Sequence, residues 1–327
     1  MKILVTGVAG FIGFHCTLRL LEQGHQVIGF DNLNAYYDVR LKQARLDILN
    51  SRTNFDFEFG DLADHKAVSA LFERGNFDLV LHLGAQAGVR YSIDNPFAYI
   101  DSNVTGTLSV LEACRRTDVR NMIYASSSSV YGANVEQPFS VKDRVDRPVS
   151  LYAATKRANE LMCESYSRLY QLKLIGLRFF TVYGPWGRPD MAYFKFANLI
   201  RSGQPIAVYN HGKMGRDFTF IDDIVDGVCA AVYRISDPDT PAAHKVYNLG
   251  NSKPERLMDM ISFLERALGE KAELRFLPMQ PGDVYETFAD ISESTAELGY
   301  EPKVSLSDGL NRFAQWHAET YWPLFSK

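Results

Sequence analysis

The segment KILVTGVAGFIG, residues 2–13, decides the fold class of this chain. KILVT is rich in β-branched and apolar residues and is typical of a strand, and an apolar run with helical periodicity starts at Phe11. Gly7, Gly10 and Gly13 occupy the junction with the spacing GxxGxxG. Glycines permit a tight turn and close backbone approach, and free N–H groups at a helix N-terminus favour a pyrophosphate. The segment therefore predicts a dinucleotide-binding unit.

The N-terminal half continues this alternation of strands and helices. QVIGF (26–30), FDFEF (55–59), DLVLHL (78–83) and NMIYAS (121–126) predict four further strands, and helical patterns lie between them. Such alternation indicates a parallel sheet covered on both faces. A helix over about 151–170 and a strand over 172–179 follow, and the regularity ends after Gly184.

We therefore predict an α/β fold with a doubly wound, Rossmann-like parallel sheet. Residues 1–183 are expected to form the dinucleotide-binding domain, which includes the polar motifs at the end of the fifth strand and the start of the following helix. Residues 184–327 form mainly a smaller C-terminal α/β substrate-binding lobe, and a crossing of the chain between the two lobes stays open.

Composition excludes several classes of function. The net charge of −4 gives no reason to expect nucleic acid or an anionic membrane as a partner. No apolar run reaches the roughly 20 residues that cross a bilayer, and MKILVTG enters a strand at once, so we expect neither a membrane span nor a signal peptide. No residues have metal-ligand spacing. The cysteines lie far apart, which predicts reduced thiols and a cytoplasmic location: Cys16, Cys114, Cys163 and Cys229.

Acidic residues after the second and third predicted strands bear on the nucleotide. Asp31 stands 18 residues after Gly13, where a carboxylate accepts both adenosine ribose hydroxyls and repels a 2′-phosphate, so NAD is favoured over NADP. Its alternative role is to initiate the turn in FDNLN. Asp61 faces either the adenine edge or the N-terminus of the next helix, as its cap.

YAATK places Tyr152 and Lys156 on one face at the start of a helix. A free tyrosine titrates near about pH 10, but a neighbouring ammonium and the positive charge of oxidised nicotinamide both favour the phenolate. SSSSVYG (126–132) follows the fifth predicted strand at the cleft of a doubly wound sheet, where Ser127 could hold a substrate alcohol. The choice among Ser126 to Ser129 stays open, and a polar loop is the alternative.

These features together resemble the extended short-chain dehydrogenase/reductase family, over nearly the whole chain. Within it the chain is most similar to the nucleotide-sugar 4-epimerases that act on UDP-glucuronate. The stretches that carry the resemblance are DNLNAYYDVRLKQARL (31–46), HLGAQAGVRYSIDNPFAYIDSN (82–103), SSSSVYG, YAATK, LRFFTVYGPWGRPDMA (177–192), GRDFTFIDD (215–223) and PMQPGDV (278–284). Gly84, where alanine is commoner, and Val8 are small departures that remove no reacting group.

The resemblance implies the site residues. Ser127, Tyr152 and Lys156 correspond to the catalytic triad. NAD contacts are implied for Gly7, Gly10, Phe11, Ile12, Gly13, Asp31, Asn32, Asp61, Leu62, Leu83, Ala85, Gln86, Asn103, Ser126, Tyr152 and Lys156. Contacts with the UDP-sugar are implied for Gln86, Arg90, Ser127, Ser128, Ser129, Tyr152, Thr181, Arg188, Tyr209, Arg216, Gln280 and Asp283. Tyr183 is expected beside Thr181 in the same pocket.

The implied reaction is the reversible C4 epimerisation of UDP-glucuronate to UDP-galacturonate through a 4-keto sugar. Tyr152 takes the proton of the 4-hydroxyl, and tightly bound NAD takes the C4 hydride and returns it to the other face. Arg216 suits the diphosphate because a guanidinium makes fork-like contacts with phosphate oxygens. An ion pair with Asp217 or Asp222 is its alternative.

Several of these assignments have plainer alternatives. Tyr209 either stacks on uracil or only packs, and Gln280 and Asp283 either reach the ribose or form a Pro-Gly-Asp turn. His82 is expected to be a satisfied core or cleft-wall histidine.

Arg188 stands in the loop GPWGRPDMAYF (184–194), where it is either solvated or holds a C5 carboxylate through two contacts. Because the 4-keto intermediate of a glucuronate is a β-keto acid, Arg188 and Thr181 are further expected to hold the carboxylate so that decarboxylation is slow. The prolines and the tryptophan of the loop would lower the entropy lost on binding.

Other functions remain as alternatives. These are a 4-epimerase of a neutral or N-acetylated UDP-sugar, a UDP-glucuronate decarboxylase, and a non-catalytic NAD sensor. Dehydratases that resemble the family carry an Asp-Glu pair where this chain has Ser128 and Ser129, which disfavours dehydration. The resemblance also implies a homodimer formed through residues 103–116 and 151–166, whose apolar faces could equally pack inside one chain.

Overall fold

The computed structural model describes residues 1–279 and 285–325. Its main sheet has seven strands, and each neighbouring pair is parallel. The strand order reverses between β1 and β4, and doubly wound sheets bind ligands beyond the carboxyl ends of the strands at such a point. In order across the sheet the strands are β10 (His244–Leu249), β6 (Lys173–Phe179), β5 (Asn121–Ser127), β4 (Leu79–His82), β1 (Lys2–Thr6), β2 (Gln26–Asp31) and β3 (Phe55–Phe59).

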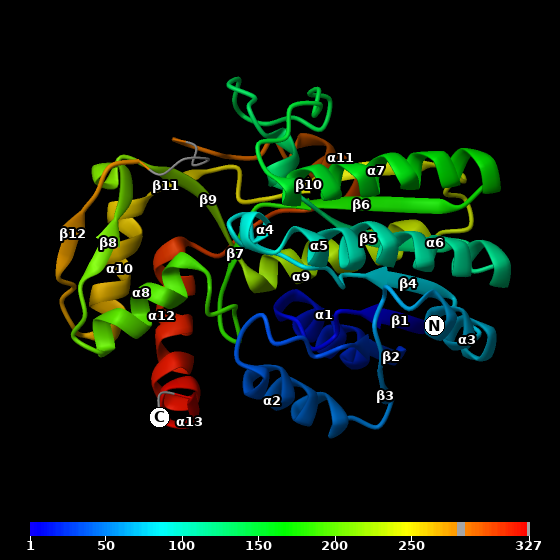
Figure 1. Ribbon diagram of the computed structural model, residues 1–327, viewed down its shortest axis with the longest axis horizontal. Helices are drawn as coiled ribbons and strands as arrows, with labels where there is room; N and C mark the ends of the chain where they lie inside the picture. The colour runs from blue at the N-terminus through cyan, green and yellow to red at the C-terminus, as the bar shows by residue number, and fades with distance from the viewer. Residues whose placement is uncertain (280–284, 326–327) are drawn as a thin grey trace.

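Helices cover both faces of this sheet (Figure 1). One face carries α1 (Phe11–Glu22), α2 (Val39–Asn50) and α9 (Ile221–Ser236), and the other carries α3 (His65–Gly75), α6 (Gly106–Thr117) and α7 (Leu151–Tyr170). In β1, Ile3 and Val5 pack into one apolar core and Leu4 into the other. Strands buried on both faces are nearly continuous apolar runs, which is why KILVT shows no polar alternation. The predicted doubly wound α/β fold is confirmed.

The helix α7 spans the residues that the sequence predicts, 151–170. Ser150 caps it, because its Oγ accepts a hydrogen bond from the backbone N–H of Ala153 at 3.1 Å. The helix ends at Tyr170, and the residue that follows it, Gln171, has a φ of +57°. This cap fixes Tyr152 and Lys156 in the first two turns, next to the end of β5.

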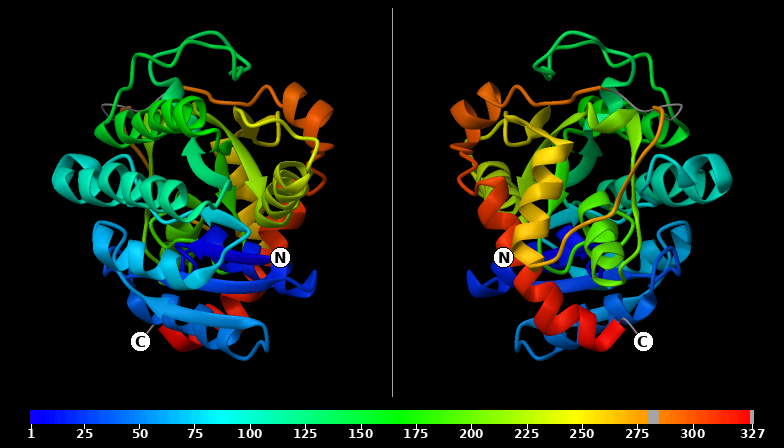
Figure 2. Two further views of the ribbon diagram at one scale, coloured as in Figure 1. Left: turned by 90° about the vertical axis from the view of Figure 1, so that its right-hand side faces the viewer. Right: turned by 90° about the vertical axis from the view of Figure 1, so that its left-hand side faces the viewer.

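A second, smaller lobe lies beside the sheet, on the left of Figure 1 and facing the viewer in the right-hand view of Figure 2. It contains a three-stranded sheet and a two-stranded sheet. Its elements are β7 (Thr181–Tyr183), β9 (Gly215–Phe220), β11 (Pro254–Arg256), β8 (Ile206–Val208), β12 (Leu274–Phe276), α8 (Ala192–Arg201), α10 (Leu257–Leu268) and α12 (Leu306–Trp316).

The chain crosses between the lobes more than once. Both α9 and β10 follow residue 184 in sequence, yet they complete the main sheet and its helical cover. The division of the chain at residue 184 stays a prediction. Short elements complete the fold: α4 (Tyr91–Asp94), α5 (Pro96–Tyr99), η1 (Ile100–Thr105), η2 (Ser128–Tyr131), η3 (Tyr209–Gly212), α11 (Ser292–Leu298), η4 (His317–Tyr321) and α13 (Trp322–Phe325).

The four cysteines are buried and free, as the sequence predicts. Burial raises the pKa of the Cys114 thiol to about 12, so this thiol is protonated at neutral pH. Within residues 1–279 and 285–325, no helix is long and apolar enough to span a bilayer. Those same residues contain no cluster of three or more His, Cys, Asp or Glu side chains suited to a metal.

Candidate active site

A cavity of about 530 Å³ lies beyond the carboxyl ends of the central strands, and residues of both lobes line it. It brings together most of the predicted site residues that the structure describes. These are Gly7, Gly10, Phe11, Ile12, Gly13, Asp31, Asn32, Asp61, Leu62, Leu83, Ala85, Gln86, Arg90, Ser126, Ser127, Ser128, Ser129, Tyr152, Lys156, Thr181, Arg188 and Arg216. Gln280 and Asp283 lie outside the described residues.

The glycine turn forms one end of the cavity. Gly7 has a φ of +70°, and a Cβ atom on Gly13 would lie 2.2 Å from the carbonyl oxygen of Gly7, so neither position accepts a side chain. α1 begins after Gly10, which has no side chain to cap the first-turn N–H groups. Those N–H groups and the positive end of the helix therefore fit the pyrophosphate of a dinucleotide such as NAD.

Asp31 is fixed at the end of β2. Its carboxylate accepts hydrogen bonds from the backbone N–H groups of Ala9, at 3.1 Å, and Leu33, at 2.8 Å. Burial raises the pKa of Asp31, and the charge of Lys42 opposes that rise. The hydrogen bond to Leu33 closes a turn, which is the alternative role that the sequence allows for Asp31. Asp31 therefore both makes the turn and lines the cavity.

Asp61 is not a helix cap. The cap of α3 is Asp64, which accepts hydrogen bonds from the N–H groups of Lys66 and Ala67. Asp61 instead accepts from the N–H of Ala63, at 2.8 Å, and from the side-chain amide of Asn32, at 2.9 Å. These bonds hold its carboxylate at the cavity wall, so the N-cap alternative is wrong.

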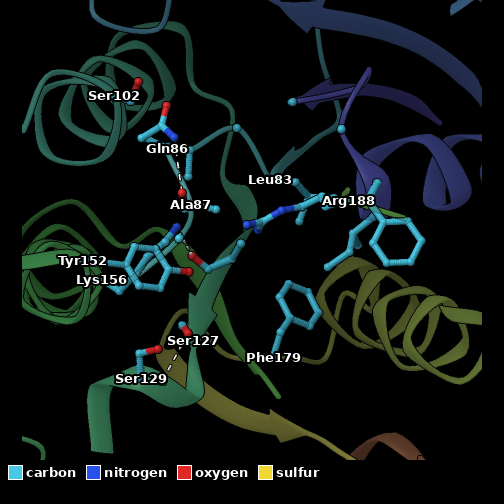
Figure 3. Close-up of a pocket in the computed structure, with 18 of the residues that line it drawn as sticks. Leu83, Gln86, Ala87, Ser102, Ser127, Ser129, Tyr152, Lys156, Phe179 and Arg188 are labelled. Atoms are coloured by element: carbon cyan, nitrogen blue, oxygen red, sulfur yellow. Dashed lines mark hydrogen bonds between the residues drawn. The ribbon is translucent and has the colours of Figure 1, made fainter. Parts of the chain in front are cut away.

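Tyr152 and Lys156 extend from α7 into the cavity, and Ser127 lies at the end of β5 nearby (Figure 3). Lys156 donates a hydrogen bond from Nζ to the carbonyl oxygen of Ala125 at 2.9 Å, and burial lowers the pKa of its ammonium to about 8. A group with this pKa still carries a proton at neutral pH.

The pKa of Tyr152 is raised, whereas the sequence led us to expect a lower value. Burial is the largest cause of the rise, and it outweighs the hydrogen bond of Ser127 and the charge of Arg188, which both lower the pKa. The protein's own groups thus leave the phenol protonated. The positive charge of oxidised nicotinamide remains as the contribution that would favour the phenolate.

The structure separates the roles of the first two serines in SSSSVYG. Ser126 donates a hydrogen bond at 2.7 Å to Glu160, whose carboxylate forms a buried ion pair with Arg178. Ser127 lowers the pKa of Tyr152 through a hydrogen bond. These contacts favour Ser127 as the hydroxyl beside the phenol.

Arg188 is not a solvated loop residue. Its side chain is 22% exposed, and its guanidinium forms an ion pair with Asp190 through Nε, at 3.0 Å, and Nη2, at 2.6 Å. Tyr36 donates a hydrogen bond to the same carboxylate at 3.1 Å, and the guanidinium lies 5.9 Å from the centroid of the Tyr36 ring. Figure 3 shows Arg188 entering the cavity from the side opposite Tyr152.

Comparison with known proteins identifies the family. A model described as the NAD dependent epimerase/dehydratase family matches residues 3–250.

The chain belongs to the NAD dependent epimerase/dehydratase family. It is 48% identical to protein CapI of Staphylococcus aureus over 98% of this chain and 99% of that protein. It is 46% identical to UDP-glucuronate 4-epimerase 4 of Arabidopsis thaliana over 98% of this chain and 76% of that protein. A crystal structure of the UDP-glucuronic acid 4-epimerase of Bacillus cereus, in complex with UDP-glucuronic acid and NAD, superposes with a TM-score of 0.89 and 36% identity, over 98% of this chain and 100% of that one.

Three residues predicted from the family resemblance lie outside the cavity wall. Asn103 is buried and exchanges hydrogen bonds with the backbone of Gln86, at 2.8 and 3.0 Å, so it holds a cavity loop from behind. The ring of Tyr209 instead lies beneath the guanidinium of Arg90, 5.6 Å from the ring centroid. Tyr183, expected beside Thr181, is fully buried in the C-terminal lobe and donates a hydrogen bond to the carbonyl of Ser305.

Arg216 lines the cavity in this epimerase-family chain, and its two proposed ion-pair partners have other contacts. Asp222 pairs with Arg312 at 2.9 Å, and Asp217 accepts hydrogen bonds from the backbone N–H groups of Asn251, Ser252 and Ala289.

His82 is a satisfied core histidine. It lies between the hydroxyls of Thr6, at 2.8 Å, and Thr107, at 3.1 Å, and burial lowers its pKa to about 3.

The sequence did not identify the residues that surround Arg188. Tyr36 lines the cavity from the connection between β2 and α2, Lys42 lines it from α2, and Asp190 is the ion-pair partner. The stretch DNLNAYYDVRLKQARL carried part of the family resemblance, and this was the only signal available for Tyr36 and Lys42. Nothing in the local pattern placed this stretch beside residues 184–190.

Proposed function

We propose that this protein is an NAD-dependent UDP-glucuronate 4-epimerase that interconverts UDP-glucuronate and UDP-galacturonate. The observation that supports this most directly is the placement of Arg188 across the cavity from Ser127, Tyr152 and Lys156 (Figure 3). A site with these three residues suits the oxidation and reduction of a sugar alcohol. A guanidinium on the facing wall suits a carboxylate on that sugar.

The proposed mechanism assigns a role to each side chain. When bound, NAD would accept the hydride of C4 and return it to the opposite face of the sugar. Ser127 orients the 4-hydroxyl, and Tyr152 takes its proton as C4 becomes a ketone. Tyr152 then returns the proton to the oxygen after the sugar has turned. Lys156 supplies the positive charge that stabilises the phenolate. Because the hydride is returned to the sugar, no net oxidation results.

The glycine turn, Asp31 and Asp61 would hold the dinucleotide, and Arg216 the diphosphate of the sugar nucleotide. The other cavity-lining residues predicted from the sequence would complete the two sites, with Asn103 acting through the loop that it supports. We propose that residues 1–183 supply most of the NAD site and that residues after 184 supply most of the sugar-nucleotide site.

Arg188 would also protect the intermediate. A 4-keto glucuronate is a β-keto acid, and it loses carbon dioxide most readily when the bond from C5 to the carboxylate stands perpendicular to the plane of the ketone. Arg188 and Thr181 would hold that bond near the plane. An Arg188 or Thr181 variant that forms no more UDP-pentose than the unaltered protein would contradict this role.

The first experiment is to incubate the purified protein with UDP-glucuronate and no added NAD, and to follow the sugar protons by NMR. Signals of UDP-galacturonate that grow to a stable mixture are expected, because bound NAD is regenerated in each turnover. Signals of UDP-pentose would indicate a decarboxylase instead. An unchanged spectrum, followed by turnover of neutral UDP-sugars, would assign a neutral-sugar epimerase. Bound NAD with no turnover of any UDP-sugar would indicate a sensor.

We further propose a homodimer that forms through α6 and α7. Leucine side chains on the outer surfaces of these helices are exposed, with exposed fractions of 40% for Leu108, 55% for Leu161 and 67% for Leu169. Sedimentation should give a dimer, and Leu161→Glu should give a monomer because it buries a charge in the interface. Leu324→Glu, an equally exposed leucine on α13, is the control and should stay dimeric. The four free cysteines and the use of NAD support a cytoplasmic location.

A further inference from the structure

Arg45 is the largest fully buried side chain with a charge, and its contacts are unusual. It extends from α2 and is 0% exposed. Within the described part of the chain its hydrogen bonds go to three backbone carbonyls and one phenol, and none of them goes to a carboxylate. Burying a guanidinium is costly, and an apolar side chain of similar size often packs at lower cost. Such a cation therefore calls for an explanation other than packing.

The carbonyls belong to two segments that are far apart in sequence. Nη1 donates to the carbonyl of Ala9, at 2.7 Å, in the glycine turn. Nη2 donates to the carbonyls of Trp186, at 2.6 Å, and Gly187, at 3.1 Å, directly before Arg188. One planar group thus joins the turn that faces the dinucleotide to the loop that presents the arginine.

The loop is held in a conformation that it would not adopt freely. Trp186 has a φ of +58°, in the left-handed region that bulky residues rarely occupy. His15, on α1, makes a 3.0 Å hydrogen bond to the carbonyl of Pro185, and Phe14 packs against the ring of Trp186 at 5.6 Å between centroids. Strained backbone persists where the surrounding structure over-determines it, and it concentrates at functional sites.

The glycine turn is held on both sides at the same residue. The N–H of Ala9 donates to Asp31, and the carbonyl of Ala9 accepts from Arg45. Tyr37 fixes the guanidinium, since its phenol accepts a 2.7 Å hydrogen bond and its ring lies 5.6 Å below. A shift of the turn that weakened its bond to Arg45 would therefore also disturb residues 186–187.

We propose that Arg45 is a positioning residue that couples the dinucleotide turn to the orientation of Arg188, so that NAD and the carboxylate of the sugar nucleotide bind cooperatively. This inference rests on the proposed function for the identity of the two ligands. Coupling of this kind is reciprocal: each ligand strengthens the binding of the other by the same factor.

The test uses Arg45→Lys and Arg45→Met in the full chain with its bound NAD. A lysine keeps the charge but cannot reach both segments with a planar fork. Arg40→Lys and Arg40→Met are the matched controls, because Arg40 lies on the same helix, at the surface, paired with Asp38. Circular dichroism and thermal melting establish that each variant is folded.

Two measurements separate positioning from general loosening. Calorimetry gives the Kd of UDP-glucuronate and of neutral UDP-glucose. A dehydrogenase that consumes released NAD gives the rate at which NAD leaves the protein, with and without each sugar nucleotide. We expect Arg45→Lys to raise the Kd of UDP-glucuronate about tenfold or more and that of UDP-glucose less than twofold. In the unaltered protein, UDP-glucuronate should slow NAD release more than UDP-glucose does. In Arg45→Lys, the two sugar nucleotides should slow NAD release equally.

If Arg45→Lys loses affinity for both sugar nucleotides by the same factor, or for neither, the ratio of the two Kd values stays unchanged. That result would overturn the inference. If Arg45→Met does not fold, Arg45→Lys alone decides the matter. Failure of the proposed function is distinguishable, because the unaltered protein would then not bind UDP-glucuronate in preference to UDP-glucose.

Discussion

Asp190 binds one edge of the Arg188 guanidinium, with Nε 3.0 Å from Oδ1 and Nη2 2.6 Å from Oδ2. A guanidinium has five N–H donors, and this pair uses two of them. A ligand carboxylate can therefore approach the second edge, formed by Nη1 and Nη2, while Asp190 stays in place. The ion pair orients Arg188 and does not by itself block it.

This geometry predicts that Arg188→Lys will not preserve recognition of a uronate. The single ammonium of a lysine would be drawn to Asp190, and it has no second edge for the ligand. We expect the KM for UDP-glucuronate to rise about 10- to 100-fold, as for a lost charge-assisted hydrogen bond, and that for UDP-glucose to change less than twofold. Initial rates by NMR measure both. A variant with the unaltered KM for UDP-glucuronate would show that Arg188 does not contact the carboxylate.

Tyr152→Phe should slow turnover strongly and leave the cofactor in place. Removal of a general acid–base group typically costs about 10²- to 10⁴-fold in rate, and we expect kcat to fall by about 10³-fold. The glycine turn and Asp31 do not depend on the phenol, so the NAD content of the purified variant should match that of the unaltered protein. Chromatography of the denatured supernatant measures it. Full activity in this variant would exclude Tyr152 as the base.

The buried ammonium of Lys156 predicts a fall in activity at alkaline pH. Burial lowers its pKa to about 8, so the charge that stabilises the phenolate is present below that pH and is lost above it. kcat/KM for UDP-glucuronate should therefore decline above about pH 8. Lys156→Arg, although slower, should lose this decline because a guanidinium keeps its proton. An alkaline limb shared by both proteins would assign the titration to another group.

His82 should make the fold sensitive to acid. Burial lowers its pKa in the folded state to about 3, from about 6.5 in the unfolded chain, so the unfolded state binds one more proton between these values. The free energy of unfolding then falls with decreasing pH by about 1.4 kcal/mol per pH unit from this residue. His82→Gln can still bond to Thr6 and Thr107 and should have a shallower slope. Urea unfolding at pH 7, 6 and 5 measures the difference; equal slopes would contradict the assignment.

The sequence predicted the parts of the fold that depend on local signals. The bounds of α7 follow from its helical periodicity, and the glycine turn follows from its position between a strand and a helix. The proximity of Tyr152, Lys156 and the serine run could be predicted because each lies at a fixed place relative to those elements, whereas the choice among Ser126 to Ser129 could not.

Contacts between distant segments gave no such signal. Arg45 belongs to a helix whose polar residues suggest exposure, and its hydrogen bonds to distant carbonyls, such as those of Ala9 and Trp186, explain its burial. Likewise Tyr36 meets Asp190 across 154 positions of sequence. The raised pKa of Tyr152 depends on how completely the fold buries the phenol, which composition and spacing do not reveal.

The last strand of the main sheet bears on how this chain is made. β6 ends at Phe179, and its neighbour β10 does not begin until His244. As the chain leaves the ribosome, the far edge of β6 therefore stays unpaired while the intervening residues are synthesised. An unpaired strand edge is a template for aggregation. A fragment that ends near residue 183 would keep that edge open, so the nucleotide-binding half should not be obtainable alone as a well-behaved protein.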